Sequence, residues 1–103
     1  MKRNRKPSLH ELRVFAFMMQ RIDSDYYGLE IMKGTDISAG TLYPILSRWE
    51  QREWVTSDWE DINESQAGRR RRRYYRLTSD GISFAKRVLE EQTKIFTTLG
   101  VVS

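Results

Sequence analysis

The strongest chemical signal in the sequence is a run of five arginines, Arg69–Arg73, followed by Tyr74. Guanidinium groups crowded onto one short segment repel one another unless an anion neutralises them. Phosphate does this well, because each arginine can bind it through two parallel hydrogen bonds. The alternative is a charge balance within the chain, against the acidic residues Asp58, Glu60, Asp61 and Glu64. The run therefore predicts a phosphate-binding segment, with a self-neutralised surface as its rival.

A second candidate is segment 39–52, where apolar residues recur every three or four positions: Ala39, Leu42, Leu46 and Trp49. This spacing predicts a helix with one buried stripe. The opposite face carries small or hydrogen-bonding residues: Gly40, Thr41, Tyr43, Pro44, Ser47, Arg48 and Gln51. Such residues can contact base edges or phosphates, whereas a merely solvated face is usually rich in lysine and glutamate. An ordinary amphipathic helix is the alternative.

The sequence offers little for catalysis or metal binding. The chain has no cysteine and a single histidine, so no thiolate site or histidine cluster can form within one chain. The acidic residues lack the spacing of a paired acid and base. We therefore expect no enzymatic activity, no catalytic residue, no metal and no cofactor.

The composition narrows the choice of partner. With 103 residues, 39% of them hydrophobic, the chain is sized for one globular domain and is too apolar for a disordered one. A net charge of +4 favours a polyanionic partner, either nucleic acid or an anionic membrane surface. No apolar run approaches the roughly 20 residues of a membrane helix, and no signal-peptide core follows the basic N-terminus. We expect a cytoplasmic protein with no membrane association.

The hydrophobic periods predict a mostly α fold with a small β-hairpin (α+β). The expected helices cover about 8–22, 26–33 and 39–52, the strands 55–59 and 72–77, and the last helix 79–99. Two short helices joined by a tight turn and followed by a hairpin are typical of a winged helix-turn-helix, with the hairpin as the wing. Residues 61–68 are expected to form a long, irregular and mobile wing tip.

Individual residues support these bounds. Ser8 opens a segment with capping-box spacing, and Thr78 is suited to cap the last helix. Gly34 suits the end of the second helix, whose expected core residues are Leu29 and Met32. Three parts follow: a basic flexible arm (1–7), the DNA-binding domain (8–78) and a C-terminal dimerisation helix (79–103). The arm either touches phosphates or the minor groove or does nothing specific.

A stripe with three-four spacing follows the last helix: Ile82, Ala85, Leu89, Gln92, Phe96 and Leu99. The small winged core leaves little to cover such a helix, so a seam between two copies is favoured over an intramolecular core. The predicted dimer interface contains Leu12, Phe15, Met19, Ala85, Leu89, Gln92, Phe96 and Leu99. The tryptophans, Trp49, Trp54 and Trp59, are either core or interface residues or part of a flat site for a small aromatic effector.

Three segments resemble the PadR-like family of winged helix-turn-helix transcription regulators: Tyr27–Ile31, Ser38–Glu50 and Arg73–Gly81. The combination of Gly-Thr-Leu-Tyr-Pro with Tyr-Tyr-Arg-Leu-Thr is specific, and the resemblance covers roughly residues 9–90. The chain departs from the family's usual sequence at Trp49, where leucine is usual, and at Arg70, where the wing usually has proline. With one C-terminal helix, the chain is similar to the short form of the family.

The resemblance implies a homodimer, often a repressor, that binds double-stranded DNA at a near-palindromic operator. It implies that the helix bearing Thr41, Tyr43 and Pro44 enters the major groove while the wing follows the backbone. The predicted DNA contacts are Tyr27, Ser38, Gly40, Thr41, Tyr43, Pro44, Ser47, Arg48, Arg69, Arg70, Arg71, Arg72 and Tyr74. The alternatives are a winged-helix protein-interaction module and a sensor gated by an aromatic ligand.

Overall fold

The first helix begins where the sequence predicts. In the computed structural model, which describes residues 6–100, α1 spans Leu9–Met18. Its cap Ser8 accepts a hydrogen bond from the backbone N–H of Glu11 at 3.1 Å. A 3-10 turn, Met19–Arg21, follows, so the α-helix is shorter than predicted. Asp23, with φ 69°, then turns the chain toward the next element.

The second helix, α2, spans Gly28–Thr35 and buries a different face from the predicted one. Ile31 and Thr35 lie in the interior, whereas Leu29 is 54% exposed. The prediction of Leu29 as a core residue was therefore wrong. A two-turn helix is compatible with either pair of apolar positions, and only its packing against α1 decides between them.

Gly34 lies within α2 and not at its end, which is a second correction. The ring of Phe17 occupies the space that a Cβ atom would need at this position, so close helix packing explains the glycine. The helix is instead capped by Asp36 in the left-handed conformation (φ 57°), which short polar residues tolerate better than most.

The third helix, α3, spans Ala39–Gln51 and matches its prediction closely. Leu42, Leu46 and Trp49 are buried as expected, although Ala39 at its start is exposed. The helix runs without interruption through Pro44, which removes one backbone donor from the interior of the helix. The buried stripe fixes which face of α3 points outward.

The wing is a hairpin of β2 (Val55–Trp59) and β3 (Arg73–Leu77), paired antiparallel. The sequence did not predict β1 (Tyr26–Tyr27), which pairs with the outer side of β3 and gives the sheet order β1-β3-β2. The wing tip is not wholly irregular, because it contains a single helical turn, α4 (Glu64–Ala67). Asn63 caps this turn, and Gly68 ends it at φ 69°.

The last helix, α5, spans Ser79–Thr98, and its cap Thr78 accepts a hydrogen bond from the N–H of Gly81 at 3.0 Å. Gly81 is close to the carbonyl of Trp54, where a side chain would not fit. The first half of α5 completes the core, in which Phe15 and Trp49 stack with ring centroids 3.8 Å apart.

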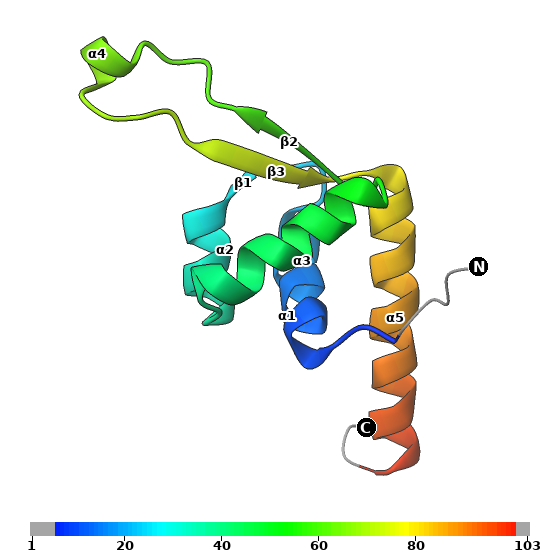
Figure 1. Ribbon diagram of the computed structural model, residues 1–103. Helices are drawn as coiled ribbons and strands as arrows, with labels where there is room; N and C mark the ends of the chain where they lie inside the picture. Colours follow the sequence, from blue (N-terminus) through cyan, green and yellow to red (C-terminus); the bar gives the residue numbers. More distant parts are fainter. Residues whose placement is uncertain (1–5, 101–103) are drawn as a thin grey trace.

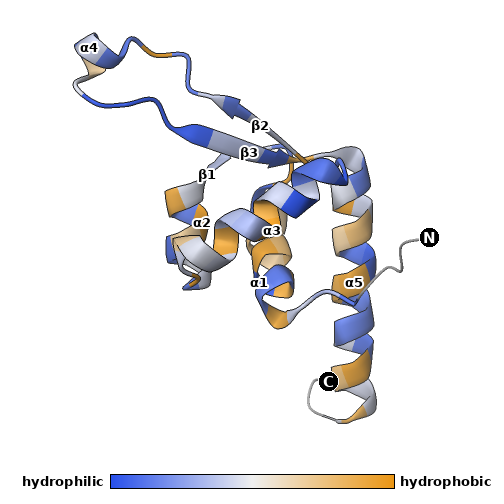
Figure 2. Ribbon diagram, in the orientation of Figure 1, coloured by the Kyte–Doolittle hydropathy of each residue, from blue (hydrophilic) through white to orange (hydrophobic). Residues whose placement is uncertain are grey.

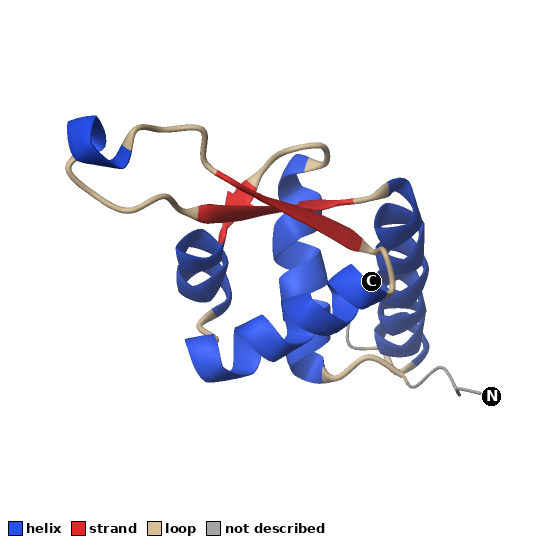
Figure 3. Cartoon of the chain, turned by 45° about the horizontal axis from the view of Figure 1, so that its top comes forward, coloured by secondary structure: helices blue, strands red, loops and turns tan. Residues whose placement is uncertain are grey.

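The predicted element order is confirmed, with β1 and α4 added. Helices α1, α2 and α3 and the first half of α5 gather below the sheet, and the second half of α5 extends past them (Figure 1). Apolar residues gather where the helices face each other, while the hairpin and its tip are largely hydrophilic (Figure 2). The start of α3 and the wing tip project to the same side of the molecule (Figure 3). This is a winged helix-turn-helix.

Candidate nucleic-acid interface

The outward face of α3 carries the residues predicted to contact DNA. Thr41 is half-buried, and the others on this helix and its cap are exposed: Ser38, Gly40, Tyr43, Pro44, Ser47 and Arg48. A Cβ atom at Gly40 would meet no atom of the described residues within 4 Å, so packing within the protein does not require glycine there. Glycine at an exposed position allows another molecule to approach the backbone closely. This face is therefore small, polar and accessible.

Tyr43 also has a structural contact. Its ring, 42% exposed, reaches α2, where its hydroxyl fills the space that a side chain at Gly28 would need. This contact fixes the separation between the start of α2 and the middle of α3. Tyr43 therefore sets the helix-turn-helix geometry while presenting part of its ring to solvent.

Arg48 is directed away from the rest of the predicted face. Its Nη2 lies 3.6 Å from Glu11 Oε1 on α1, and Trp49 Nε1 donates to the other oxygen of Glu11 at 3.2 Å. The Arg48 guanidinium is half-exposed, so this ion pair contributes little stability. Its position makes Arg48 a weaker candidate for a base contact than Tyr43 or Ser47.

Glu60 organises the base of the wing, and the sequence analysis did not single it out. Its carboxylate accepts hydrogen bonds from Arg69 Nη1 at 2.6 Å and Nη2 at 2.9 Å, and from the backbone N–H of Arg72 at 2.9 Å. The Tyr27 hydroxyl donates to the same carboxylate at 3.3 Å. Glu60 thus joins both arms of the hairpin to β1. These hydrogen-bonding partners come together only because of the register of the hairpin, so no spacing in the sequence predicts the cluster.

This arrangement changes the acidity of two groups. The hydrogen bonds from Arg69 are the main reason that the pKa of Glu60 falls from 4.5 to about 2. Desolvation, followed by the negative charge of Glu60, raises the pKa of Tyr27 above its usual 10. Both residues therefore keep one protonation state throughout the neutral range.

Acid is expected to loosen the wing through Glu60. The stabilisation from ionised Glu60 is fully present above its unfolded pKa of 4.5, declines as the pH falls, and is lost below about 2. The carbon-13 NMR shift of the Glu60 carboxyl group reports this titration directly. A midpoint near 4.5 in the folded protein would contradict the ion pair.

The arginine run divides into paired and unpaired members. Arg69 pairs with Glu60, and Arg73 Nη2 lies 3.4 Å from Glu50 and 2.7 Å from the Ser57 hydroxyl. Within residues 6–100, no carboxylate pairs with the side chains of Arg70, Arg71 and Arg72. The charge-balance alternative thus accounts for the ends of the run and leaves its middle for an external anion.

The base of the wing brings together three predicted contacts from separate elements. The rings of Tyr27 and Tyr74 meet edge to face with centroids 6.4 Å apart, and the Arg72 guanidinium lies 5.7 Å from the Tyr27 centroid. Two aromatic rings and one guanidinium thus lie close together at the base of the wing. Among the tryptophans, Trp49 is buried, Trp54 is partly buried and Trp59 is 51% exposed beside Arg73.

The residues predicted for a dimer seam fall into two groups. Phe15 and Ala85 are fully buried in the protomer's own core, and Leu12, Met19 and Leu89 pack against that core. Gln92 is partly buried, while Phe96 is 45% and Leu99 is 69% exposed. The exposed part of the predicted seam is therefore the end of α5.

Two further expectations concern the rest of the chain. Of the basic arm, Lys6 is described, and residues 1–5, which include Lys2, Arg3 and Arg5, lie outside the described residues. Among the described residues, no group of three or more potential ligands could hold a metal ion. In the same part of the chain no helix is long and apolar enough to cross a membrane.

Several solved structures share this fold. A PadR family transcriptional regulator from Eggerthella lenta is 27% identical, with a TM-score of 0.68 over 87% of this chain and 83% of that one. A transcriptional regulator from Clostridium thermocellum is 28% identical, with a TM-score of 0.66 over 86% and 87% of the two chains. NadR in complex with 4-hydroxyphenylacetate is 16% identical, with a TM-score of 0.69 over 89% and 60%, which shows the fold alone.

The family of the chain follows from its amino-acid sequence. No curated protein is detectably similar to the chain. A sequence profile of the transcriptional regulator PadR-like family matches residues 18–87, which include α2, α3, the whole wing and the first part of α5. These elements carry the exposed helix face and the unpaired arginines described above. The chain therefore belongs to the PadR-like family of transcriptional regulators, which bind DNA.

Proposed function

We propose that the protein is a cytoplasmic repressor that binds a near-palindromic operator as a homodimer. One observation carries the DNA-binding part of the proposal. Arg70, Arg71 and Arg72 have no carboxylate partner among the described residues, and they lie on a wing that projects to the same side as the start of α3. A protein that places a helix in the major groove and a wing against the neighbouring phosphates needs this geometry.

The two surfaces have different roles in this proposal. In this proposal the hydroxyl groups of Thr41 and Ser47 and the exposed part of the Tyr43 ring face the major groove, where each base pair presents its own pattern of donors and acceptors. The wing arginines bind phosphates, which position the protein and add affinity without reading sequence. Specificity therefore resides in α3, and most of the salt dependence resides in the wing.

Tyr43→Ala is expected to weaken binding to the operator far more than binding to random DNA. Loss of a base-edge contact typically removes about 1–3 kcal/mol of discrimination. Affinities for both duplexes, measured by fluorescence anisotropy at one salt concentration, give the difference.

Tyr43→Phe is the matched control for this prediction, because it keeps the ring that packs against α2. Thermal unfolding of both variants separates lost recognition from lost stability. Equal losses on operator and random DNA would assign Tyr43 to a role outside base recognition.

The homodimer is proposed from the exposed apolar end of α5. Ile95, Phe96 and Leu99 are each at least 45% exposed on a part of the helix that extends past the rest of the fold (Figure 1). A second copy would cover these side chains and place two recognition helices about one DNA turn apart. We therefore propose that residues 8–78 form a DNA-binding domain and that residues 79–103 form a dimerisation helix.

An aromatic effector is the proposed second partner. Trp54 and Phe84 stack with centroids 4.1 Å apart beside a cavity, and both are only partly buried. NadR, which shares the fold, is known in complex with 4-hydroxyphenylacetate. The rival, a protein-interaction module docking through its arginines, would bind all DNA sequences alike. Competition between operator and random DNA distinguishes the two.

A further inference from the structure

Two carboxylates in the first arm and the tip of the wing hold the backbone of the arginine run in the second arm. Glu60, which directly follows β2, accepts a hydrogen bond from the backbone N–H of Arg72 at 2.9 Å. Glu64, in α4, accepts one from the backbone N–H of Arg71 at 2.7 Å. The backbone N–H of Glu60 also donates to the Arg72 carbonyl at 2.8 Å. The two arms are therefore joined beyond the ends of β2 and β3.

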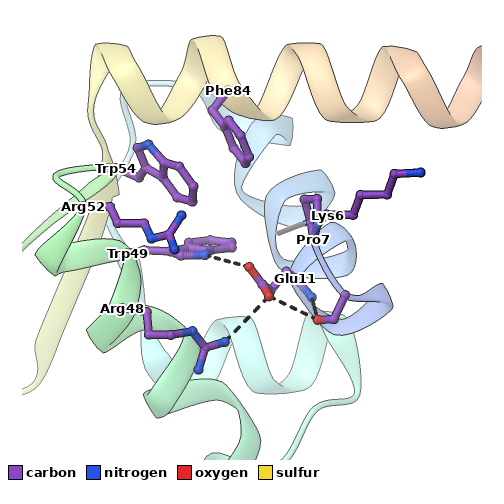
Figure 4. Close-up of a pocket in the computed structure, with 9 residues that line it drawn as sticks. Lys6, Pro7, Glu11, Arg48, Trp49, Arg52, Trp54 and Phe84 are labelled. Carbon is purple, nitrogen blue, oxygen red and sulfur yellow. Dashed lines mark hydrogen bonds and ion pairs between the residues drawn. The ribbon is translucent and has the colours of Figure 1, made fainter. Parts of the chain in front are cut away.

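These hydrogen bonds fix the backbone of the run and leave its side chains exposed. Arg71 and Arg72 are both exposed, and their guanidinium groups keep all their donors for an external anion. Glu11 acts in a different way on α3, because it pairs with the side chain of Arg48 and directs it toward α1 (Figure 4). A carboxylate that binds a backbone N–H thus orders an arginine without neutralising its charge.

Arg69 and Tyr27 hold Glu60 in place. The Glu60 side chain is 11% exposed, and both terminal nitrogens of Arg69 donate to its carboxylate, at 2.6 and 2.9 Å. The Tyr27 hydroxyl donates to the same group at 3.3 Å. Because the two-point contact of Arg69 is already used within the wing, this arginine braces the hairpin while its neighbours remain without a carboxylate partner in the described chain.

Order before binding adds to affinity. Fixing the backbone of each residue costs free energy, and a segment that is already fixed does not lose this freedom when it binds. We propose that Glu60 and Glu64 are positioning residues for DNA binding, which order the backbone of Arg71 and Arg72 before these arginines meet phosphates. This role rests on the proposed DNA-binding function. It means that two acidic residues strengthen binding to a polyanion.

The direction of the effect separates this role from simple charge attraction. Loss of Glu60 removes a negative charge from the wing and releases the guanidinium of Arg69. Both changes would strengthen attraction to phosphates if charge alone mattered. Loss of order in the run has the opposite effect, so the sign of the change in DNA affinity decides between the two.

The first test measures the affinity of the full chain for a mixed-sequence DNA duplex by fluorescence anisotropy over a range of salt concentrations. Glu60→Ala is expected to weaken binding about ten-fold. Glu64→Ala should have a smaller effect, because Glu64 is exposed and holds a single backbone N–H. The slope of log affinity against log salt should not fall in either variant, since every arginine of the run is retained.

Asp61→Ala is the matched control, because it removes the same charge from the same arm. Asp61 is exposed and forms no ion pair among residues 6–100. Its loss should not weaken binding. Glu60→Gln removes the same charge as Glu60→Ala but keeps an acceptor oxygen, so it should recover part of the lost affinity. Tighter binding by Glu60→Ala, or equal losses in Glu60→Ala and Asp61→Ala, would overturn the proposed role.

The second test follows amide hydrogen exchange in the protein alone. The Arg72 amide should exchange at least about ten-fold faster in Glu60→Ala, and the Arg71 amide should do so in Glu64→Ala. The amide of Leu46, buried in α3, should be unaffected and shows that the core stays folded. Unchanged exchange at both arginines would overturn the ordering step.

The two tests also separate this role from the function on which it rests. If the unaltered protein bound no DNA, the proposed function would fail and the positioning role would fail with it. If the unaltered protein bound DNA and Glu60→Ala bound it equally well, the positioning role alone would fail.

Discussion

Replacement of Arg70, Arg71 and Arg72 together by glutamine will weaken binding to every DNA duplex and flatten its dependence on salt. Each phosphate contact contributes about 0.9 to the slope of log affinity against log salt concentration, so three lost contacts should reduce it by about 2.7 for each protomer. These three side chains are the members of the run without a carboxylate partner in the described chain. Operator and random DNA should lose affinity by similar factors.

The control for this prediction removes positive charge elsewhere. Lys86→Gln with Arg87→Gln changes two exposed residues on α5, away from the wing. This double variant should retain the salt slope of the unaltered protein. If the triple wing variant also kept that slope, its arginines would point away from DNA, and the internal charge-balance interpretation would return.

The sequence predicted the elements whose signals are local. Ser8 and Thr78 cap their helices as expected, since each needs only a backbone N–H three residues further along the chain. The buried stripe of α3 likewise depends only on spacing within one helix. Such features are independent of the tertiary structure.

The features that the sequence missed depend on contacts between distant segments. A strand of two residues, Tyr26–Tyr27, carries no periodic signal and exists only because β3 lies beside it. Glu60 looked like one acidic residue among several until the hairpin placed it opposite Arg69 and Arg72. Leu29 was misassigned because a short helix has two plausible buried faces.

The sequence was enough to locate the candidate DNA-binding residues. It was not enough to show which of them form ion pairs within the protein. The composition of the run from Arg69 to Arg73 indicated an anion, but the sequence could not show which members Glu60 and Glu50 neutralise. The face of α3 was predicted from its period. The direction of Arg48 toward Glu11 required the position of α1.

The second large effect concerns assembly: Phe96→Asp together with Leu99→Asp will give a monomer that has lost most operator affinity. Burial of each such side chain is worth roughly 1.5–3 kcal/mol, and a charge at a closed interface costs more. Both side chains are largely exposed in the protomer, so its core should stay folded. Light scattering gives the mass, and circular dichroism reports the fold.

Leu89 is not suited to this experiment, because it packs on the protomer's own core and a charge there would also destabilise the fold. Thr97→Asp is the matched control, since Thr97 is exposed and helical spacing places it across α5 from Ile95 and Leu99. It should remain dimeric. If the unaltered protein were a monomer, or if the double variant remained a dimer, the end of α5 would not be the dimer interface.

Selection of bound duplexes from a random pool tests sequence-specific recognition by a dimer most directly. The unaltered protein is expected to enrich an inverted repeat whose half-sites are centred about 10 base pairs apart, one turn of the double helix. The Tyr43→Ala variant should enrich the same motif less strongly. Enrichment of no motif, or of a single site without symmetry, would contradict the account.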